Sequence, residues 1–175
     1  ADWGPKEGKW ANIAPNTPLY KDGKIFFCHG YNINGVMLQL SDDLKSVSVV
    51  WRTDVLDTHH GGYVEVNGTI YGSNWINNNQ GNWCAIDWNT GAKGYETTWT
   101  GGKGKGTISA ADGMLYCYDE RRGAVALVNP DPAKFDIVSE FRITKGVGPH
   151  WAHPVIVNGV LYIRHGFALM AYKVK

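Results

Sequence analysis

Charged side chains, cysteine pairs and long apolar runs are all scarce in this chain of 175 residues. Charged residues make up 19% of it, and 17 Lys and Arg against 16 Asp and Glu leave a formal net charge of +1. A chain so close to neutral has no basic arm for nucleic acid or for an anionic membrane surface, so we expect no nucleic-acid partner. No apolar stretch approaches 18 residues, so we also expect no membrane span.

The cysteine pattern and the spacing of apolar residues exclude further classes of protein. Cys28, Cys84 and Cys117 are widely spaced and form no C-x-x-C pair, which argues against a zinc ribbon or a dithiol redox motif. We expect three free, buried thiols. No window keeps apolar residues at positions i, i+3, i+4 and i+7, so we expect no helix. What is abundant is glycine (22) and tryptophan (8), which favours short strands joined by tight turns.

A repeat of about 45 residues is the strongest signal in the chain. An Asp-Gly or Asn-Gly pair recurs at Asp22-Gly23, Asn67-Gly68, Asp112-Gly113 and Asn158-Gly159. Each pair lies between two short runs of aromatic and β-branched residues, which indicates a β-hairpin because both turn residues tolerate positive φ. A third run follows in every unit and a fourth in the first three. Four antiparallel strands in about 45 residues match one blade of a β-propeller.

The sequence therefore predicts an all-β fold, a β-propeller of four-stranded antiparallel blades with about four blades in this chain. We expect a single propeller segment over residues 1–175, with blades at about 15–54, 61–100, 106–142 and 152–175, the last lacking its fourth strand. A blade buries its faces only against neighbouring blades, so the first and last blades of a partial ring each leave one face uncovered. We expect the missing blades to come from self-association or from the rest of a longer chain.

The second repeat unit resembles a known motif. Its segment from Ala85 through Asp87, Thr90 and Gly91 to Trp99 is similar to the tryptophan-docking repeat A-x-D-x-x-T-G-K-x-x-W. That repeat marks the pyrroloquinoline-quinone-like propellers, also called the quinoprotein alcohol dehydrogenase-like family. The Asp and the Thr-Gly pair are expected to build the turn between the third and fourth strands, and the Trp to pack against the next blade.

The resemblance implies an eight-bladed ring, of which this chain is about half, and a periplasmic or secreted location. The family includes quinone-dependent dehydrogenases and non-catalytic assembly scaffolds. Its enzymes hold pyrroloquinoline quinone between a Trp and a vicinal Cys-Cys disulfide, above a calcium ion. Here no two cysteines are adjacent, and no residue set matches the calcium ligands. Quinone and calcium are thus implied by the resemblance alone, and catalytic activity stays open.

All six histidines fall on one face of the predicted blades. In a four-stranded meander, the loops after the second strands and the connections between blades share one face. These segments hold His29, His59, His60, His150, His153 and His165. Histidine titrates and binds metals near neutral pH, so we expect this face to hold a ligand or a partner. We predict no metal site, with His60, His150 and His153 as weak candidates; acid–base and purely structural roles stay open.

Other polar and aromatic side chains accompany the histidines. The loop from Ser73 to Trp83 is rich in amides and indoles, which suits a neutral polar ligand such as a sugar; the alternative is a mobile loop whose Asn residues only build turns. Arginines on this face suit a carboxylate or phosphate, unless they pair with acidic neighbours. The candidate ligand-binding residues are therefore His59, His60, His150, Trp151, His153, Arg164, His165, Asn74, Trp75 and Arg121.

We expect first a binding propeller that holds a small polar ligand or a partner on the histidine-bearing face. Two alternatives follow from the resemblance. One is a quinone-dependent alcohol or polyol dehydrogenase, and the other is a non-catalytic protein–protein scaffold of the outer-membrane assembly type.

Overall fold

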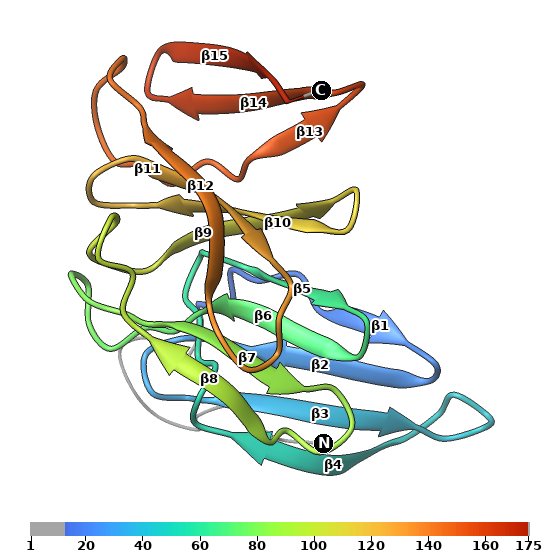
Figure 1. Ribbon diagram of the computed structural model, residues 1–175. Coiled ribbons are helices and arrows are strands. Elements are labelled where there is room, and N and C mark those ends of the chain that lie inside the picture. Colours follow the sequence, from blue (N-terminus) through green and yellow to red (C-terminus); the bar gives the residue numbers. More distant parts are fainter. Residues whose placement is uncertain (1–12, 175) are drawn as a thin grey trace.

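The computed structural model describes residues 13–174 and folds them into four antiparallel sheets (Figure 1). Residues 1–12 and 175 of the predicted propeller segment lie outside this range. Sheet 1 consists of β1 (Leu19–Lys21), β2 (Lys24–Cys28), β3 (Gly35–Leu40) and β4 (Val47–Thr53). Sheet 2 consists of β5 (Tyr63–Val66), β6 (Thr69–Ser73), β7 (Trp83–Asp87) and β8 (Lys93–Thr97). Sheet 3 consists of β9 (Gly106–Ala111), β10 (Met114–Asp119), β11 (Ala124–Asn129) and β12 (Asp136–Arg142). Sheet 4 consists of β13 (Val155–Val157), β14 (Val160–His165) and β15 (Ala168–Lys173).

Within every sheet the strands are hydrogen-bonded in chain order, and consecutive sheets are stacked along the chain (Figure 1). The first strands of sheets 2, 3 and 4 lie together, since β9 contacts both β5 and β13. This arrangement confirms the predicted all-β propeller of antiparallel blades. Among residues 13–174, no helix has the length and apolarity that crossing a membrane requires.

The turns between first and second strands adopt the conformation that the Asp-Gly and Asn-Gly pairs favour. Asp22, Asn67, Asp112 and Asn158 have φ between 51 and 52°, and the glycine after each also has positive φ. These left-handed conformations match the right-handed twist of the flanking strands. The four hairpins are therefore encoded locally by two residues each.

The core lies between the sheets. Ile70 and Ile86 are cross-strand partners in sheet 2 and share a buried cluster with Phe26 of sheet 1. The next pair along the same strands, Tyr71 and Ala85, belongs to the cluster shared with sheet 3. Side chains alternate between the two faces of a strand, so apolar residues at consecutive positions require a neighbouring sheet on both faces.

Tryptophans at the ends of the outer strands join neighbouring sheets. Trp51 at the end of β4 lies on the turn of sheet 2, where a Cβ added to Gly91 would come within 2.6 Å of its ring. Asp87 holds that turn, because its Oδ1 accepts hydrogen bonds from the Asn89 amide (3.0 Å) and from the Thr90 amide and hydroxyl (both 2.8 Å). Glycine, with no side chain, permits this close approach.

Trp99 makes the corresponding link from sheet 2 to sheet 3. It is 2% exposed, and its Nε1 donates to Glu140 Oε2 on β12 at 2.9 Å. Its ring also contacts Phe135, with centroids 6.0 Å apart. A buried indole whose N–H has a partner stabilises the junction through its apolar area as well as through the hydrogen bond.

Truncation of a side chain between two sheets should be costly. Leu115 is 1% exposed between sheets 2 and 3. We expect Leu115→Ala to lower the free energy of unfolding by about 2–5 kcal/mol, measured by urea denaturation, because it removes buried apolar surface and leaves a cavity. Leu44→Ala is the control: Leu44 is 71% exposed in the turn before β4, so its truncation should change the free energy by less than about 0.5 kcal/mol. Equal effects would contradict the inter-sheet core.

Candidate functional site

A pocket of about 550 Å³ opens where the loops of all four sheets meet. Tyr31 comes from the loop after β2, Asn78 from the loop after β6, Glu120 from the loop after β10, and Trp151 from the connection into β13. The remaining wall residues are Pro15, His59, His60 and Lys105. We call this space the four-sheet pocket. It lies on the face predicted from the histidine distribution.

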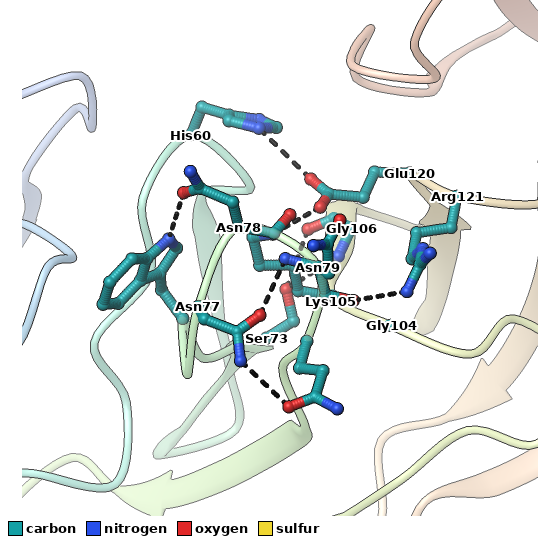
Figure 2. A network of polar contacts seen from close by, with 12 residues as sticks. His60, Ser73, Asn77, Asn78, Asn79, Gly104, Lys105, Gly106, Glu120 and Arg121 are labelled. Atoms are coloured by element: carbon teal, nitrogen blue, oxygen red, sulfur yellow. Dashed lines mark hydrogen bonds and ion pairs between the residues drawn. The ribbon is translucent and has the colours of Figure 1, made fainter.

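A buried set of charges forms one side of the pocket (Figure 2). The side chains of Lys105 and Glu120 are each 6% exposed and form an ion pair through Glu120 Oε1. Lys105 Nζ also donates to the carbonyl oxygen of Asn78 at 3.0 Å. Glu120 Oε2 lies 3.2 Å from His60 Nε2. Burial raises the pKa of Glu120, but His60 and Lys105 outweigh it and hold that pKa below its usual value, so the carboxylate is ionised at neutral pH.

Five aromatic and imidazole rings form a continuous row beside these charges. The centroid distances are 4.9 Å from Trp75 to Tyr31, 4.6 Å from Tyr31 to His59, 5.1 Å from His59 to His60 and 5.2 Å from His60 to Trp151. Burial lowers the pKa of His59, and the neighbouring His60 and Lys105 lower it further. His59 is therefore neutral at pH 7. Trp151 is 56% exposed, so much of its surface is open to a ligand.

The amide-rich loop between β6 and β7 is held by specific hydrogen bonds (Figure 2). Asn77 Oδ1 accepts from the Asn79 amide at 2.8 Å, and Trp75 Nε1 donates to Asn78 Oδ1 at 3.2 Å. Arg121 donates to the carbonyl oxygen of Asn79 at 3.0 Å and thereby ties the loop to sheet 3. The Asn side chains thus build turns, and the loop contributes Asn78 to the pocket wall.

Asn74, at the base of the same loop, is 5% exposed, and its side-chain amide makes hydrogen bonds within the fold. It donates to the carbonyl oxygen of Val55 at 3.1 Å and to Glu96 Oε1 at 2.8 Å, and it accepts from the Asn82 amide at 2.7 Å. The structure thus gives Asn74 a structural role and places it outside the pocket lining.

His150 and His165 lie at the junction of sheets 3 and 4, away from the pocket lining. Their rings stack with centroids 3.7 Å apart, and His150 Nδ1 contacts the hydroxyl of Tyr118. The two ring nitrogens of His165 lie 2.7 Å from the carbonyl oxygens of Lys145 and Gly148. Burial lowers the pKa of His150 to about 4, and the neighbouring His165 contributes to the shift.

The other candidates lie at the margin of the site or apart from it. His153 Nε2 is 3.1 Å from the carbonyl oxygen of His60, and His153 lines a smaller pocket of about 240 Å³ that shares His60 with the four-sheet pocket. Arg164 is exposed on the outer face of β14, where it is the cross-strand partner of Leu169. His29, 3% exposed, lies inside the fold.

The weak metal candidates do not come together. His60 faces Glu120, His150 faces Tyr118 and His165, and His153 reaches a backbone carbonyl. Within residues 13–174 no group of three or more His, Cys, Asp or Glu side chains is placed to hold a metal ion.

Sequence reasoning did not select Tyr31, Asn78, Lys105 and Glu120 as ligand-binding candidates. Acidic and basic side chains next to each other in the loop after β10 suggested pairing among neighbours. Instead, Glu120 pairs with Lys105 and His60, whereas Arg121 reaches Asn79. The strand topology alone indicates that Lys105 and Glu120 can meet, because the connection before β9 and the loop after β10 lie on the same face of one sheet.

No protein-family model matches this chain, and no curated protein does. Solved structures do match. BamB from Moraxella catarrhalis has a TM-score of 0.64 at 16% identity, over 90% of this chain and 42% of its own. The chain has the pyrroloquinoline-quinone-like β-propeller fold.

Two further matches with this propeller fold are enzymes. A quinohemoprotein alcohol dehydrogenase from Pseudomonas putida HK5 has a TM-score of 0.57 at 16% identity, over 85% of this chain and 28% of its own. A europium-containing methanol dehydrogenase has a TM-score of 0.53 at 16% identity, over 75% and 25%. The chain thus spans less than half the length of all three structures. At these identities the likeness concerns the fold alone.

The buried ion pair should show strong energetic coupling. Lys105→Met leaves the Glu120 carboxylate buried without its ammonium partner, so we expect it to lower the free energy of unfolding by about 3–5 kcal/mol. The double variant Lys105→Met/Glu120→Leu should cost less than the sum of the two single variants, because neither charge is then left unpaired. Urea denaturation of the four proteins measures the coupling. If the changes in the free energy of unfolding were additive, the two side chains would have no energetic coupling.

The lowered pKa of His150 predicts acid sensitivity. In the unfolded chain His150 titrates near its ordinary value of 6.5, whereas in the folded protein it titrates at about 4. Between these values the unfolded state binds more protons, so the free energy of unfolding should fall as the pH is lowered from 6.5 to 4. His150→Gln should flatten this dependence in denaturant titrations at each pH. An unchanged slope in the variant would assign the acid sensitivity to other groups.

Proposed function

We propose that this chain is a binding module of the pyrroloquinoline-quinone-like propeller fold, with a small, neutral, polar ligand held in the four-sheet pocket. One observation carries the proposal. The loops of all four sheets each contribute a wall residue, namely Tyr31, Asn78, Glu120 and Trp151, to a single pocket. Convergent polar groups beside apolar surface are typical of small-molecule sites.

The charges of the pocket favour a neutral ligand. The ammonium of Lys105 and the carboxylate of Glu120 compensate each other within an ion pair, and His59 is neutral at pH 7 because its pKa is lowered. The ion pair and His59 therefore offer no net charge to attract an ion. The indole of Trp151 and the phenol of Tyr31 offer apolar rings beside these polar groups. A sugar has this combination of hydroxyl groups and an apolar face, so we assign the ligand to the sugars or related polyols.

Quinone-dependent dehydrogenation has less support from the residues. The three cysteines are free and buried, as predicted, and they belong to three different sheets. Burial raises the pKa of Cys28 and Cys117, which makes both poor nucleophiles. A vicinal disulfide is thus incompatible with these residues, and the described side chains offer no cluster of acidic groups for calcium. The residues of this chain do not fit the quinone–calcium arrangement that the resemblance implies.

A non-catalytic scaffold is the second candidate. It is supported by the likeness to BamB and by large apolar side chains on the surface, among them Phe167 (83% exposed) and Leu169 (69% exposed). Exposed apolar patches are typical of protein-binding surfaces. Either function suits the periplasmic or secreted location that the family resemblance implies, and this location is part of the proposal.

Titration of intrinsic tryptophan fluorescence tests the ligand site. We expect saturable changes with neutral monosaccharides (glucose, galactose or mannose). Trp151→Ala should weaken binding about tenfold, because the loss of about 60 Å² of apolar contact at about 25 cal/mol per Å² costs about 1.5 kcal/mol. Phe141→Ala is the matched control, because Phe141 is an exposed aromatic on the outer strand β12.

Three outcomes would contradict this assignment. Equal affinity of the parent chain and Trp151→Ala would mean that the four-sheet pocket is not the site. Binding of pyrroloquinoline quinone with calcium, together with dye-linked alcohol oxidation, would favour the dehydrogenase instead. Absence of small-molecule binding with a co-purifying protein would favour the scaffold.

A further inference from the structure

One buried carboxyl group holds a loop at the edge of the four-sheet pocket. Asp57 lies in the connection from β4 to β5 and is 4% exposed. Its Oδ1 accepts hydrogen bonds from the backbone amides of Gly30 (2.7 Å) and Asn34 (3.0 Å), and its Oδ2 accepts one from that of Asn32 (2.7 Å). These donors lie on both sides of Tyr31, a wall residue of the pocket. A carboxylate accepts hydrogen bonds at both oxygens at once, so one side chain holds the whole loop.

The backbone of this loop adopts a conformation that is rare for an aromatic residue. The angle φ is 86° at Gly30, 60° at Tyr31, 63° at Asn32 and 74° at Asn34. Glycine and asparagine tolerate the left-handed region, whereas a bulky residue such as Tyr31 is rarely found there. Residues in such conformations persist only where surrounding contacts hold them, and they are concentrated at functional sites. The three hydrogen bonds to Asp57 supply contacts of this kind.

The corresponding loop of sheet 3 is held in a different way. There Asp119, at the end of β10, accepts hydrogen bonds from two backbone amides of the loop that directly follows it. In sheet 1 the carboxyl group of Asp57 comes instead from a separate segment, 23 to 27 residues along the chain from its donors. The loop also lies directly on that segment, since a Cβ added to Gly30 would be 2.8 Å from His59 Cα. The position of Tyr31 is therefore tied to the connection that carries the pocket histidines.

Asp57 also holds a second ring of the pocket row through its backbone. Its carbonyl oxygen accepts a hydrogen bond from the Trp75 amide at 2.8 Å. His59, a third member of the row, follows Asp57 by two residues in the chain. The ring of Tyr31 lies between the other two, with centroid distances of 4.9 Å to Trp75 and 4.6 Å to His59. The segments that carry these three rings thus meet at Asp57.

We propose that Asp57 is a positioning residue of the four-sheet pocket: it holds Tyr31 in its left-handed conformation, with the phenol ring between Trp75 and His59, and this ring contacts the ligand. The inference rests on the proposed function, because the position of Tyr31 affects a ligand only where the four-sheet pocket is the binding site. The pocket lining includes Tyr31 and does not include Asp57. Asp57 therefore acts on the ligand through Tyr31. The ligand class is the one proposed above, the sugars or related polyols.

The indole N–H resonance of Trp75 in proton–nitrogen NMR spectra tests the positioning without any ligand. Its loss in Trp75→Phe identifies the resonance. Tyr31→Ala should shift it, because the two ring centroids are 4.9 Å apart and the ring current of Tyr31 is removed. Asp57→Asn should shift it in the same direction, because an amide has one acceptor oxygen and its Nδ2 would face a backbone N–H.

Asp87→Asn is the matched control for this measurement. Asp87 also holds a turn through three accepted hydrogen bonds, at the end of β7 opposite the pocket loop. Its substitution should leave the Trp75 resonance in place. An unshifted resonance in Asp57→Asn would overturn the proposal. Where far-UV circular dichroism shows that Asp57→Asn does not fold, Gly30→Ala replaces it, because the added Cβ pushes the loop away from the connection; an unshifted resonance in that variant would equally overturn the proposal.

Monosaccharide titration tests whether Asp57 acts through Tyr31. With glucose, galactose or mannose as the probe, Asp57→Asn and Tyr31→Ala should each weaken binding about tenfold. The double variant should bind no more weakly than Tyr31→Ala, because the contribution of Asp57 is lost with the ring that it positions. Asp87→Asn should bind like the parent chain. A double variant weakened by the product of the two effects, about a hundredfold, would mean that Asp57 acts independently of Tyr31.

The two measurements distinguish failure of this proposal from failure of the proposed function. If the parent chain binds none of the monosaccharides, the proposed function fails and the ligand contact of Tyr31 fails with it, whereas the Trp75 resonance still decides whether Asp57 holds Tyr31. If the parent chain binds a monosaccharide and Asp57→Asn changes neither the resonance nor the affinity, the ligand site stands and the positioning role of Asp57 is wrong.

Discussion

The structure depends on one constraint, which is that each sheet is apolar on both faces and must be covered on both. Consecutive positions such as Ile70 and Tyr71 direct side chains into two different cores, one shared with sheet 1 and one with sheet 3. Burial of apolar surface contributes about 25 cal/mol per Å², and a four-stranded sheet alone buries neither face. The inner pair of sheets satisfies the constraint within the chain. Sheet 4 satisfies it on one face, and the large exposed apolar residues of β13 and β15 lie on its other face.

The same stacking creates the candidate site. Once four meanders are stacked in chain order, the loops after the second strands and the connections between sheets come together on one side. The buried ion pair of Lys105 and Glu120 then joins a connection to a loop of the same sheet, and it reaches the loop of sheet 2 through the carbonyl oxygen of Asn78. Removing these charges from water is costly, and their mutual pairing with further hydrogen bonds offsets that cost. The result is a pocket wall in which the charges of Lys105 and Glu120 compensate each other.

The parts of this molecule that follow from local rules were predictable. Asp-Gly and Asn-Gly pairs specify hairpins because two residues set the turn, and alternating apolar runs specify strands. The face that carries the histidines follows from meander topology alone. Beyond that, the six histidines diverge: His59 and His60 line the pocket, whereas His150 and His165 stack on each other at a sheet junction. Sequence spacing does not indicate the direction of a side chain in a loop, because that direction depends on which groups the neighbouring sheets place beside it.

The sequence by itself determined the repeat, the four sheets, their turns and the face on which polar chemistry gathers, because each of these depends on residues close together in the chain. Tertiary structure decided which side chains share the pocket. Lys105 donates to the carbonyl oxygen of Asn78 in the loop of sheet 2, Tyr31 and Trp151 come from segments of sheets 1 and 4, and Asn74 donates to the carbonyl oxygen of Val55 in the connection from sheet 1. Such pairings depend on the distance between loops of different sheets, and that distance is set only when the apolar faces pack together.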